Sequence, residues 1–132
     1  MFSSVMMSSV AVIGLGASLG ALLRWRLGLA LNAIWPTLPL GTLAANLIGG
    51  LLIGIASEVF ISRSAIPPEW RLAIITGFLG GLTTFSTFSL EVSSQLQQGR
   101  IANAAIEITA HLLGSVLLTI VGIVIAQQVL RA

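Results

Sequence analysis

The chain has 132 residues, of which 56% are hydrophobic and only 8% are charged. Soluble domains carry about 25% charged residues, so this composition excludes an ordinary soluble protein and indicates an integral membrane protein. The formal charge of +2 comes from arginines that form no basic run, which argues against a nucleic acid partner, and no cysteine is present for a disulfide or a thiolate metal site.

Four apolar segments are long enough to cross a bilayer, which takes roughly 20 residues of helix. Short stretches rich in proline or polar residues separate them at 32–39, 62–69 and 97–100. We therefore expect an all-α membrane protein with one transmembrane domain over residues 1–132. Its spans are predicted at about 4–31, 38–61, 70–95 and 102–130.

Small residues recur four positions apart in the first three spans, a spacing that lets helix backbones approach closely. The pairs are Gly16 and Gly20, Gly50 and Gly54, and Gly77 and Gly81. This pattern predicts close helix packing and association within the bilayer.

The second span has one strongly polar side chain near its middle, that of Asn46. Its amide offers two N–H donors, which makes it a candidate to meet a dehydrated anion. The alternative is that Asn46 bonds a neighbouring helix and has only a structural role.

The third span contains the most unusual segment, Gly77–Ser89, with three glycines and five hydroxyl side chains. Such a stretch does not suit a lipid-facing helix, so we expect a broken helix beside an ion path. Carbonyls freed around Gly80 and Thr83 are candidates to hold a monovalent cation.

Beyond that glycine break, Phe85 and Phe88 are three apart and so share a helical face. The positive edges of their rings suit a small anion, although phenylalanines at this spacing more often pack in a core. The hydroxyl groups expected on the same anion path are those of Thr84, Ser86 and Thr87.

The fourth span carries a polar stripe with four-residue spacing, made up of Asn103, Glu107, His111, Ser115 and Thr119. It covers roughly 160° of the helix and climbs about 24 Å, so it is not expected to face lipid. Glu107 and His111 form an ionisable pair that is a candidate pore track or proton relay. The pair is alternatively satisfied at a helix interface or in an aqueous vestibule.

Arginines are balanced between the two sides of the membrane. In a four-span arrangement three of them fall on each side, which leaves the positive-inside rule nothing to act on. We infer insertion in both orientations and pairing as an antiparallel homodimer. If Arg24 lies too deep to count, a weak bias remains.

Three motifs together resemble the Fluc (CrcB) family of fluoride channels over essentially the whole chain. They are the G-x-x-x-G-A-x-x-R start at Gly16–Arg24, the stretch Pro39–Gly49, and the segment Gly77–Ser89 followed by Glu91. The last of these is far more specific than a generic glycine motif.

The resemblance implies an antiparallel, dual-topology dimer in the cell inner membrane, with two fluoride pores and a structural sodium ion at its centre. The function it implies is export of toxic fluoride by passive electrodiffusion, with no enzymatic step, and the expected partners are fluoride, a second copy and membrane lipid. By similarity, the pore residues are Phe85, Phe88 and Asn46, the sodium ligands are the carbonyls of Gly80 and Thr83, and Arg24 lies by an aqueous vestibule.

The fourth span departs from the pattern of some family members. Glu107 and His111 stand where those members carry tyrosine and serine, whereas Ser115 keeps a hydroxyl on the track. An ionised Glu107 beside an anion route would repel fluoride, so this residue is neutral, paired or off the path.

Two rival functions use the same architecture. A small proton-coupled exporter would exchange protons and a cationic substrate at Glu107, but such exporters place their acid in the first span, which has none here. A non-transporting scaffold would leave the polar stripes of three spans without a purpose.

Overall fold

The computed structural model describes residues 2–131, with side chains from residue 5 onward; the expected domain ends, residues 1 and 132, lie outside it. This part of the chain is entirely helical apart from its loops. The elements are α1 (Phe2–Leu31), α2 (Leu40–Ser62), α3 (Pro68–Arg71), the π-helix η1 (Leu72–Leu79), α4 (Gly80–Leu82), α5 (Phe85–Gln97) and α6 (Ile101–Arg131).

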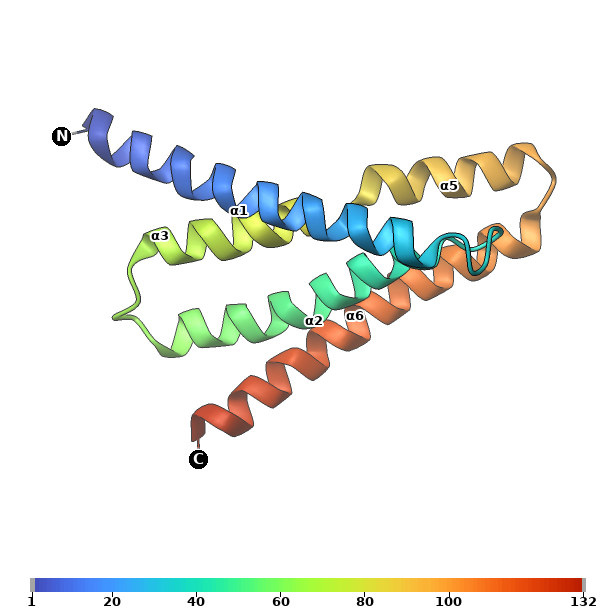
Figure 1. Cartoon of the computed structure of the whole chain (residues 1–132). Coiled ribbons are helices and arrows are strands. Elements are labelled where there is room, and N and C mark those ends of the chain that lie inside the picture. The colour runs from blue at the N-terminus through green and yellow to red at the C-terminus, as the bar shows by residue number, and fades with distance from the viewer. Residues whose placement is uncertain (1, 132) are drawn as a thin grey trace.

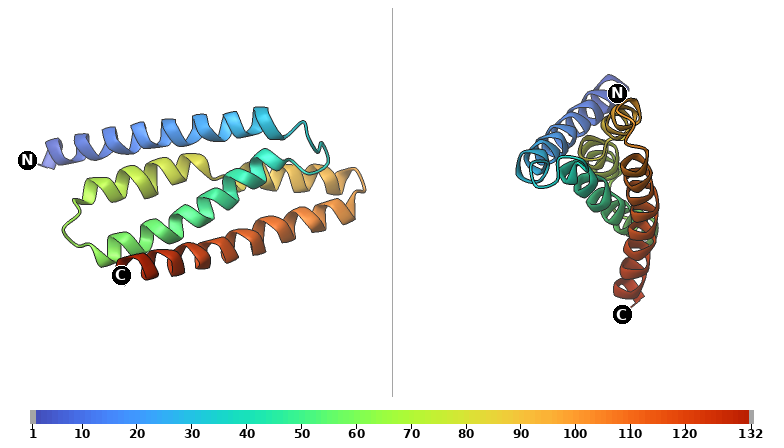
Figure 2. Two further views of the ribbon diagram at one scale, coloured as in Figure 1. Left: turned by 60° about the horizontal axis from the view of Figure 1, so that its bottom comes forward. Right: turned by 90° about the vertical axis from the view of Figure 1, so that its right-hand side faces the viewer.

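Within the described residues, four segments are long and apolar enough to cross a membrane, so the chain is a multi-pass membrane protein. They are Val5–Leu31, Leu40–Ser62, Pro68–Gln97 and Ile101–Arg131. The four segments run alongside one another, joined by short loops at alternating ends (Figures 1 and 2). The prediction of an all-α protein with four spanning helices is confirmed.

The third span is interrupted where the sequence predicted a break. Helical geometry ends at Leu82, and Thr83 and Thr84 are extended, with ψ angles of 154° and 117°. The helix restarts as α5 because the Thr84 hydroxyl accepts the backbone N–H of Thr87 at 3.1 Å, which caps the new N-terminus. In the left view of Figure 2 a short non-helical stretch separates the two helical parts of this span.

Two helix pairs form the body of the molecule. The first half of the third span lies against α1, and α2 lies against α6 (Figure 1). A Cβ added at Gly20 would lie 2.0 Å from the Phe78 carbonyl oxygen, and one at Gly54 would lie 2.2 Å from that of Thr119. The small-residue pairs predicted for close approach therefore pack helices within one chain.

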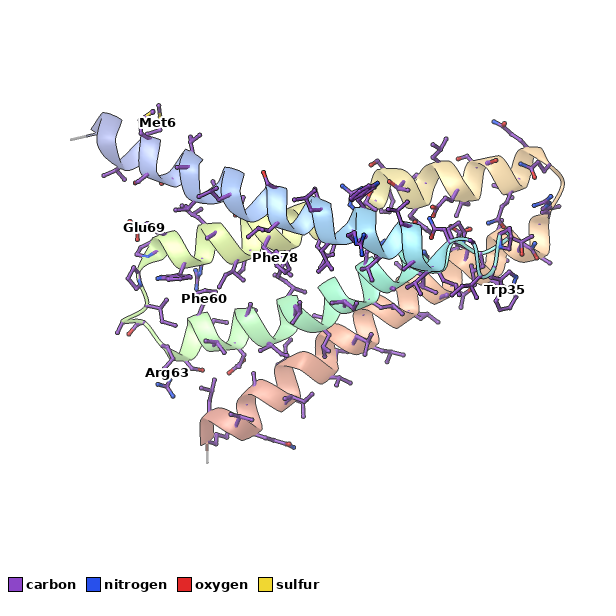
Figure 3. All side chains as sticks on the ribbon, viewed as in Figure 1. Met6, Trp35, Phe60, Arg63, Glu69 and Phe78 are labelled. Atoms are coloured by element: carbon purple, nitrogen blue, oxygen red, sulfur yellow. The ribbon has the colours of Figure 1, made fainter. Side chains whose placement is uncertain are left out.

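Labelled side chains identify the two ends of the helix bundle. Met6, Arg63 and Glu69 lie at one end, and Trp35 lies at the opposite end (Figure 3). The second half of the third span, α5, extends toward the Trp35 end and meets the start of α6 there (Figure 1). The candidate functional groups described below lie around the break and between α5 and α6.

Candidate functional site

A cavity of about 480 Å³ lies between the break in the third span, α2 and α6; we call it the central cavity. It is lined by most of the residues that the sequence singled out, namely Asn46, Gly80, Thr83, Thr84, Phe85, Phe88, His111 and Ser115. Four other candidates are not among the lining residues: Arg24, Ser86, Thr87 and Glu107. The structure thus brings residues of three spans to one space.

Asn46 is fixed by the backbone of the break. Its Oδ1 accepts the N–H of Thr84 at 2.8 Å, and its Nδ2 donates to the Thr84 carbonyl at 3.0 Å. Nδ2 of Asn46 also lies 3.0 Å from Nδ1 of His111, within hydrogen-bond distance. Both N–H groups of Asn46 are therefore engaged within the protein.

These bonds determine the tautomer of His111. Because the Thr84 N–H fixes the orientation of the Asn46 amide, Nδ2 must donate and His111 Nδ1 must accept. The proton of the neutral imidazole is then on Nε2. The His111 side chain is only 4% exposed, and its Nε2 has no hydrogen-bond partner among the described residues. A residue that lines the central cavity therefore carries a buried N–H donor without a partner among the described residues.

The two phenylalanines continue from this histidine. The Phe88 ring stacks on the His111 imidazole with centroids 4.5 Å apart and an angle of 28°. Phe85 meets Phe88 in an edge-to-face arrangement at 5.6 Å and 61°. Phe85 is 78% exposed, so it is not a core residue of this chain. The three rings form a continuous aromatic wall along the cavity.

The break also changes which carbonyl groups have partners. In a continuous helix the Gly80 carbonyl would accept from the Thr84 N–H, and the Thr83 carbonyl from the Thr87 N–H. Here those two N–H groups donate to Asn46 and to the Thr84 hydroxyl instead. Both carbonyls therefore lose their helical donors at the wall of the central cavity.

Arg24 occupies a third carbonyl of the break. Its Nε donates to the Gly81 carbonyl at 3.1 Å, so this side chain holds α1 against the end of α4. The residue is half-buried. Its predicted place by a vestibule remains an expectation, whereas its contact with the broken helix was not predicted.

The remaining hydroxyl candidates gather around Thr84. The Thr84 hydroxyl donates to the Thr87 hydroxyl at 3.0 Å and lies 3.3 Å from the Ser86 hydroxyl. Ser115, in contrast, lines the central cavity from α6. The hydroxyls of the third span therefore shape the start of α5.

A second group of polar side chains, buried or half-buried, lies between the central cavity and the Trp35 end. We call Glu91, Gln95, Glu107 and His111 the polar cluster. Gln95 Nε2 donates to the Glu107 carboxylate, which is fully buried. Potential ligand atoms of Glu91, Glu107 and His111 all lie within 4.8 Å of one another. Glu107 is thus paired with α5 and is not exposed to the central cavity.

The sequence analysis assigned no role to Glu91 and Gln95, two members of this cluster, or to Thr42, which is bound to Glu91. Glu91 Oε1 accepts the hydroxyl of Thr42 at 2.7 Å, and Gln95 also donates to the Thr37 carbonyl at 3.1 Å. The available signal was the four-residue spacing of Thr87, Glu91 and Gln95, which places a polar stripe on the third span like that on the fourth.

The polar cluster lies between two cavities. A smaller space of about 280 Å³, the end cavity, is lined by Glu91, Gln95, Ser94, Gln98 and Arg100 near the Trp35 loop. His111 lines the central cavity on the other side, and Glu107 lies beside both Gln95 and His111. A line of polar groups therefore joins the middle of the bundle to one of its ends.

Known proteins are similar in sequence to this chain over nearly its whole length. Residues 11–123 match the model of the family described as CrcB-like protein, Camphor Resistance (CrcB). The chain is 58% identical over 117 residues to the fluoride-specific ion channel FluC of Tolumonas auensis, covering 89% of this chain and 92% of that protein. It is 57% identical over 127 residues to the FluC protein of Burkholderia lata, covering 96% and 99%. The chain belongs to the CrcB family of membrane proteins.

Proposed function

We propose that this protein is a fluoride-selective channel, not an enzyme, that exports cytoplasmic fluoride across the cell inner membrane by passive electrodiffusion. The relatives that match almost its full length are named fluoride-specific ion channels. The observation that carries the proposal is the central cavity, where His111, the Ser115 hydroxyl and two phenylalanine rings line one space. Such weak and distributed partners can replace the hydration shell of a small anion and still release it.

The proposed path follows the central cavity along α5 and α6. His111 supplies an N–H donor, Ser115 supplies a hydroxyl, and Phe85 and Phe88 supply ring edges. Thr84, Ser86 and Thr87 support the path by shaping the start of α5. Arg24 serves it indirectly, by holding the break through the Gly81 carbonyl.

Asn46 acts on this path through its neighbours. Since both of its N–H groups are engaged, it positions the Thr84 backbone and keeps the His111 proton on Nε2. The anion then meets His111 rather than the amide itself. This role differs from the direct contact that the family resemblance implied.

The carbonyls of Gly80 and Thr83 are the proposed ligands of a structural sodium ion. Both have lost the N–H donors they would have in a continuous helix, which fits a cation ligand. When bound, sodium supplies a fixed positive charge beside the anion route. Two carbonyls are few for such an ion, so we expect a second copy of the chain to complete the set.

The second copy is proposed to pair antiparallel, giving a dual-topology dimer with two pores. The equal division of arginines between the two sides supports insertion in both orientations. The exposed Gly80 supplies a face near the break for that contact. Reporter fusions at the C-terminus should report both orientations in cells; a single fixed orientation would contradict the arrangement.

Fluoride efflux from liposomes, followed with a fluoride electrode, tests the function. We expect rapid efflux that needs no proton gradient and is much faster than chloride efflux in the same vesicles. Efflux no faster than from protein-free vesicles would reject the channel, and a requirement for a proton gradient would favour the coupled exporter. Replacing sodium with a large organic cation during reconstitution should lower the flux at constant ionic strength.

A further inference from the structure

The polar cluster contains more acceptor atoms than the protein supplies with donors. Three buried oxygens, Glu91 Oε2, Gln95 Oε1 and Glu107 Oε1, have no hydrogen-bond partner among the residues that the structure describes. Glu107 is fully buried, and Gln95 is only 6% exposed. Buried acceptors without partners are strongly unfavourable, and two adjacent carboxylates in a medium of low dielectric also repel each other.

The orientation of each side chain is fixed by its other bonds. Gln95 Nε2 donates to the Thr37 carbonyl and to Glu107, so its Oε1 is left as an acceptor beside the carboxylates. Glu91 Oε1 is occupied by the Thr42 hydroxyl, which leaves Oε2. The unpartnered oxygens are therefore not the result of a misplaced amide, and each of them can coordinate a cation.

His111 does not belong to this set of ligands. Its one lone pair is on Nδ1, which accepts from Asn46, and its Nε2 carries a proton. The ligands that remain are two carboxylate oxygens and one amide oxygen. Oxygen donors of this kind suit a hard divalent cation such as Mg²⁺, Ca²⁺ or Mn²⁺ better than Zn²⁺ or Cu²⁺, which favour nitrogen and sulfur.

We propose that Glu91, Gln95 and Glu107 bind one hard divalent cation, at a site separate from the Gly80 and Thr83 carbonyls. The end cavity, which Glu91 and Gln95 line, gives a route from the end of the bundle. Arg100 also lines that cavity, but its single positive charge does not balance the two neighbouring carboxylates of Glu91 and Glu107. The ion balances both carboxylates and completes the coordination of all three oxygens.

Such an ion also resolves the conflict between Glu107 and an anion path, a consequence that rests on the proposed function. Two uncompensated carboxylates between the central and end cavities would repel fluoride. A divalent cation removes that charge and leaves the His111 N–H as the group that the anion meets. Cation binding itself does not depend on fluoride conduction and is measured independently of it.

Manganese binding to the purified protein in detergent tests the site, because bound Mn²⁺ loses the sharp electron paramagnetic resonance lines of the free ion. We expect one saturable site per chain, displaced by Ca²⁺ but not by excess sodium. Glu107→Gln and Glu91→Gln should each weaken binding by about tenfold or more, since ligand charge sets the affinity of such sites. The matched control is Glu58→Gln on α2, whose carboxylate contacts Ser62 and Gln127 away from the cluster.

A second measurement uses the unaltered chain and is unaffected if a variant folds poorly. Pulsed resonance on the bound Mn²⁺ should show no imidazole nitrogen coupling, because His111 is excluded by its tautomer. Absence of saturable binding, displacement by sodium, or equal affinity in both glutamine variants and the wild type would overturn the proposal. A clear imidazole coupling would overturn the set of oxygen ligands.

Discussion

The two halves of the third span are held in place by different kinds of contact. Before the break, η1 and α4 lie against α1 with backbones almost touching, as at Gly81, where an added Cβ would lie 2.3 Å from the Ala17 carbonyl oxygen. After the break, α5 is held by hydrogen bonds that involve side chains. The Thr84 N–H donates to Asn46, the Thr42 hydroxyl donates to Glu91, and Gln95 donates to Glu107. One span therefore uses close packing in its first half and polar pairing in its second.

The difference reflects what a bilayer offers to a helix. Lipid gives little hydrophobic force between helices, so they associate through close van der Waals packing or through hydrogen bonds. Packing between glycines is rigid and dry, which suits an anchor. Polar pairing leaves donors and acceptors that an ion can use, which suits a pathway. The break lies between the closely packed half and the hydrogen-bonded half of the span. There Arg24 donates to the Gly81 carbonyl and Asn46 donates to the Thr84 carbonyl.

The largest effect on stability is expected from a substitution in the packed half. Gly20→Ala places a Cβ 2.0 Å from the Phe78 carbonyl oxygen, so one backbone must move. We expect a loss of about 3 kcal/mol, at the upper end of overpacking, measured by thermal unfolding in detergent. Gly14→Ala is the control, because its new carbon meets no described atom within 4 Å. Equal stability of the two variants would contradict close packing of α1.

A smaller loss is expected at the point where the break is fixed. Asn46→Ala removes two bonds to the Thr84 backbone and one to His111, and leaves a buried N–H without a partner. We expect about 2 kcal/mol of destabilisation and a clear reduction in fluoride efflux. The control is Asn103→Ala, which removes another half-buried amide on α6. Normal efflux in the Asn46 variant would rule out its positioning role.

The cap of α5 should contribute less again. Thr84→Val removes the hydroxyl that accepts the Thr87 N–H, and loss of such a cap costs about 1 kcal/mol. Thr109→Val is its control, since that hydroxyl only donates to the Ala105 carbonyl of its own helix. If both variants unfold at the same temperature, the Thr84 hydroxyl does not stabilise the restart of the helix.

The smallest change in stability is expected where conduction should change most. Phe85 is 78% exposed, so Phe85→Ile should alter the free energy of unfolding by less than about 0.5 kcal/mol. Phe85→Ile and Phe88→Ile should nevertheless each reduce fluoride efflux, because the aromatic edges are lost. Phe60→Ile, near Arg71 at the other end, is the control. Unchanged efflux in both pore variants would refute an aromatic role.

Much of the polar stripe on α6 could be predicted from spacing, but its partners could not. The stripe correctly indicated that Glu107 and His111 avoid lipid, since both are buried. The sequence left Glu107 neutral, paired or off the path, and the structure pairs it with Gln95, twelve positions earlier in the chain. No helical period links residues on two helices, so only their packing could reveal this contact.

The sequence by itself determined the class of the protein, its four spans and an interruption within Gly77–Ser89, because lipid imposes helices and glycine with hydroxyl residues disrupts them. Only the tertiary structure decided how the freed groups are used. Arg24 lies 57 positions from Gly81 and Asn46 lies 38 from Thr84, yet they bind the two sides of the break. The tautomer of His111 depends on that same long-range contact. Local chemistry fixed where the helix had to open, and helix packing fixed which groups were left free for an ion.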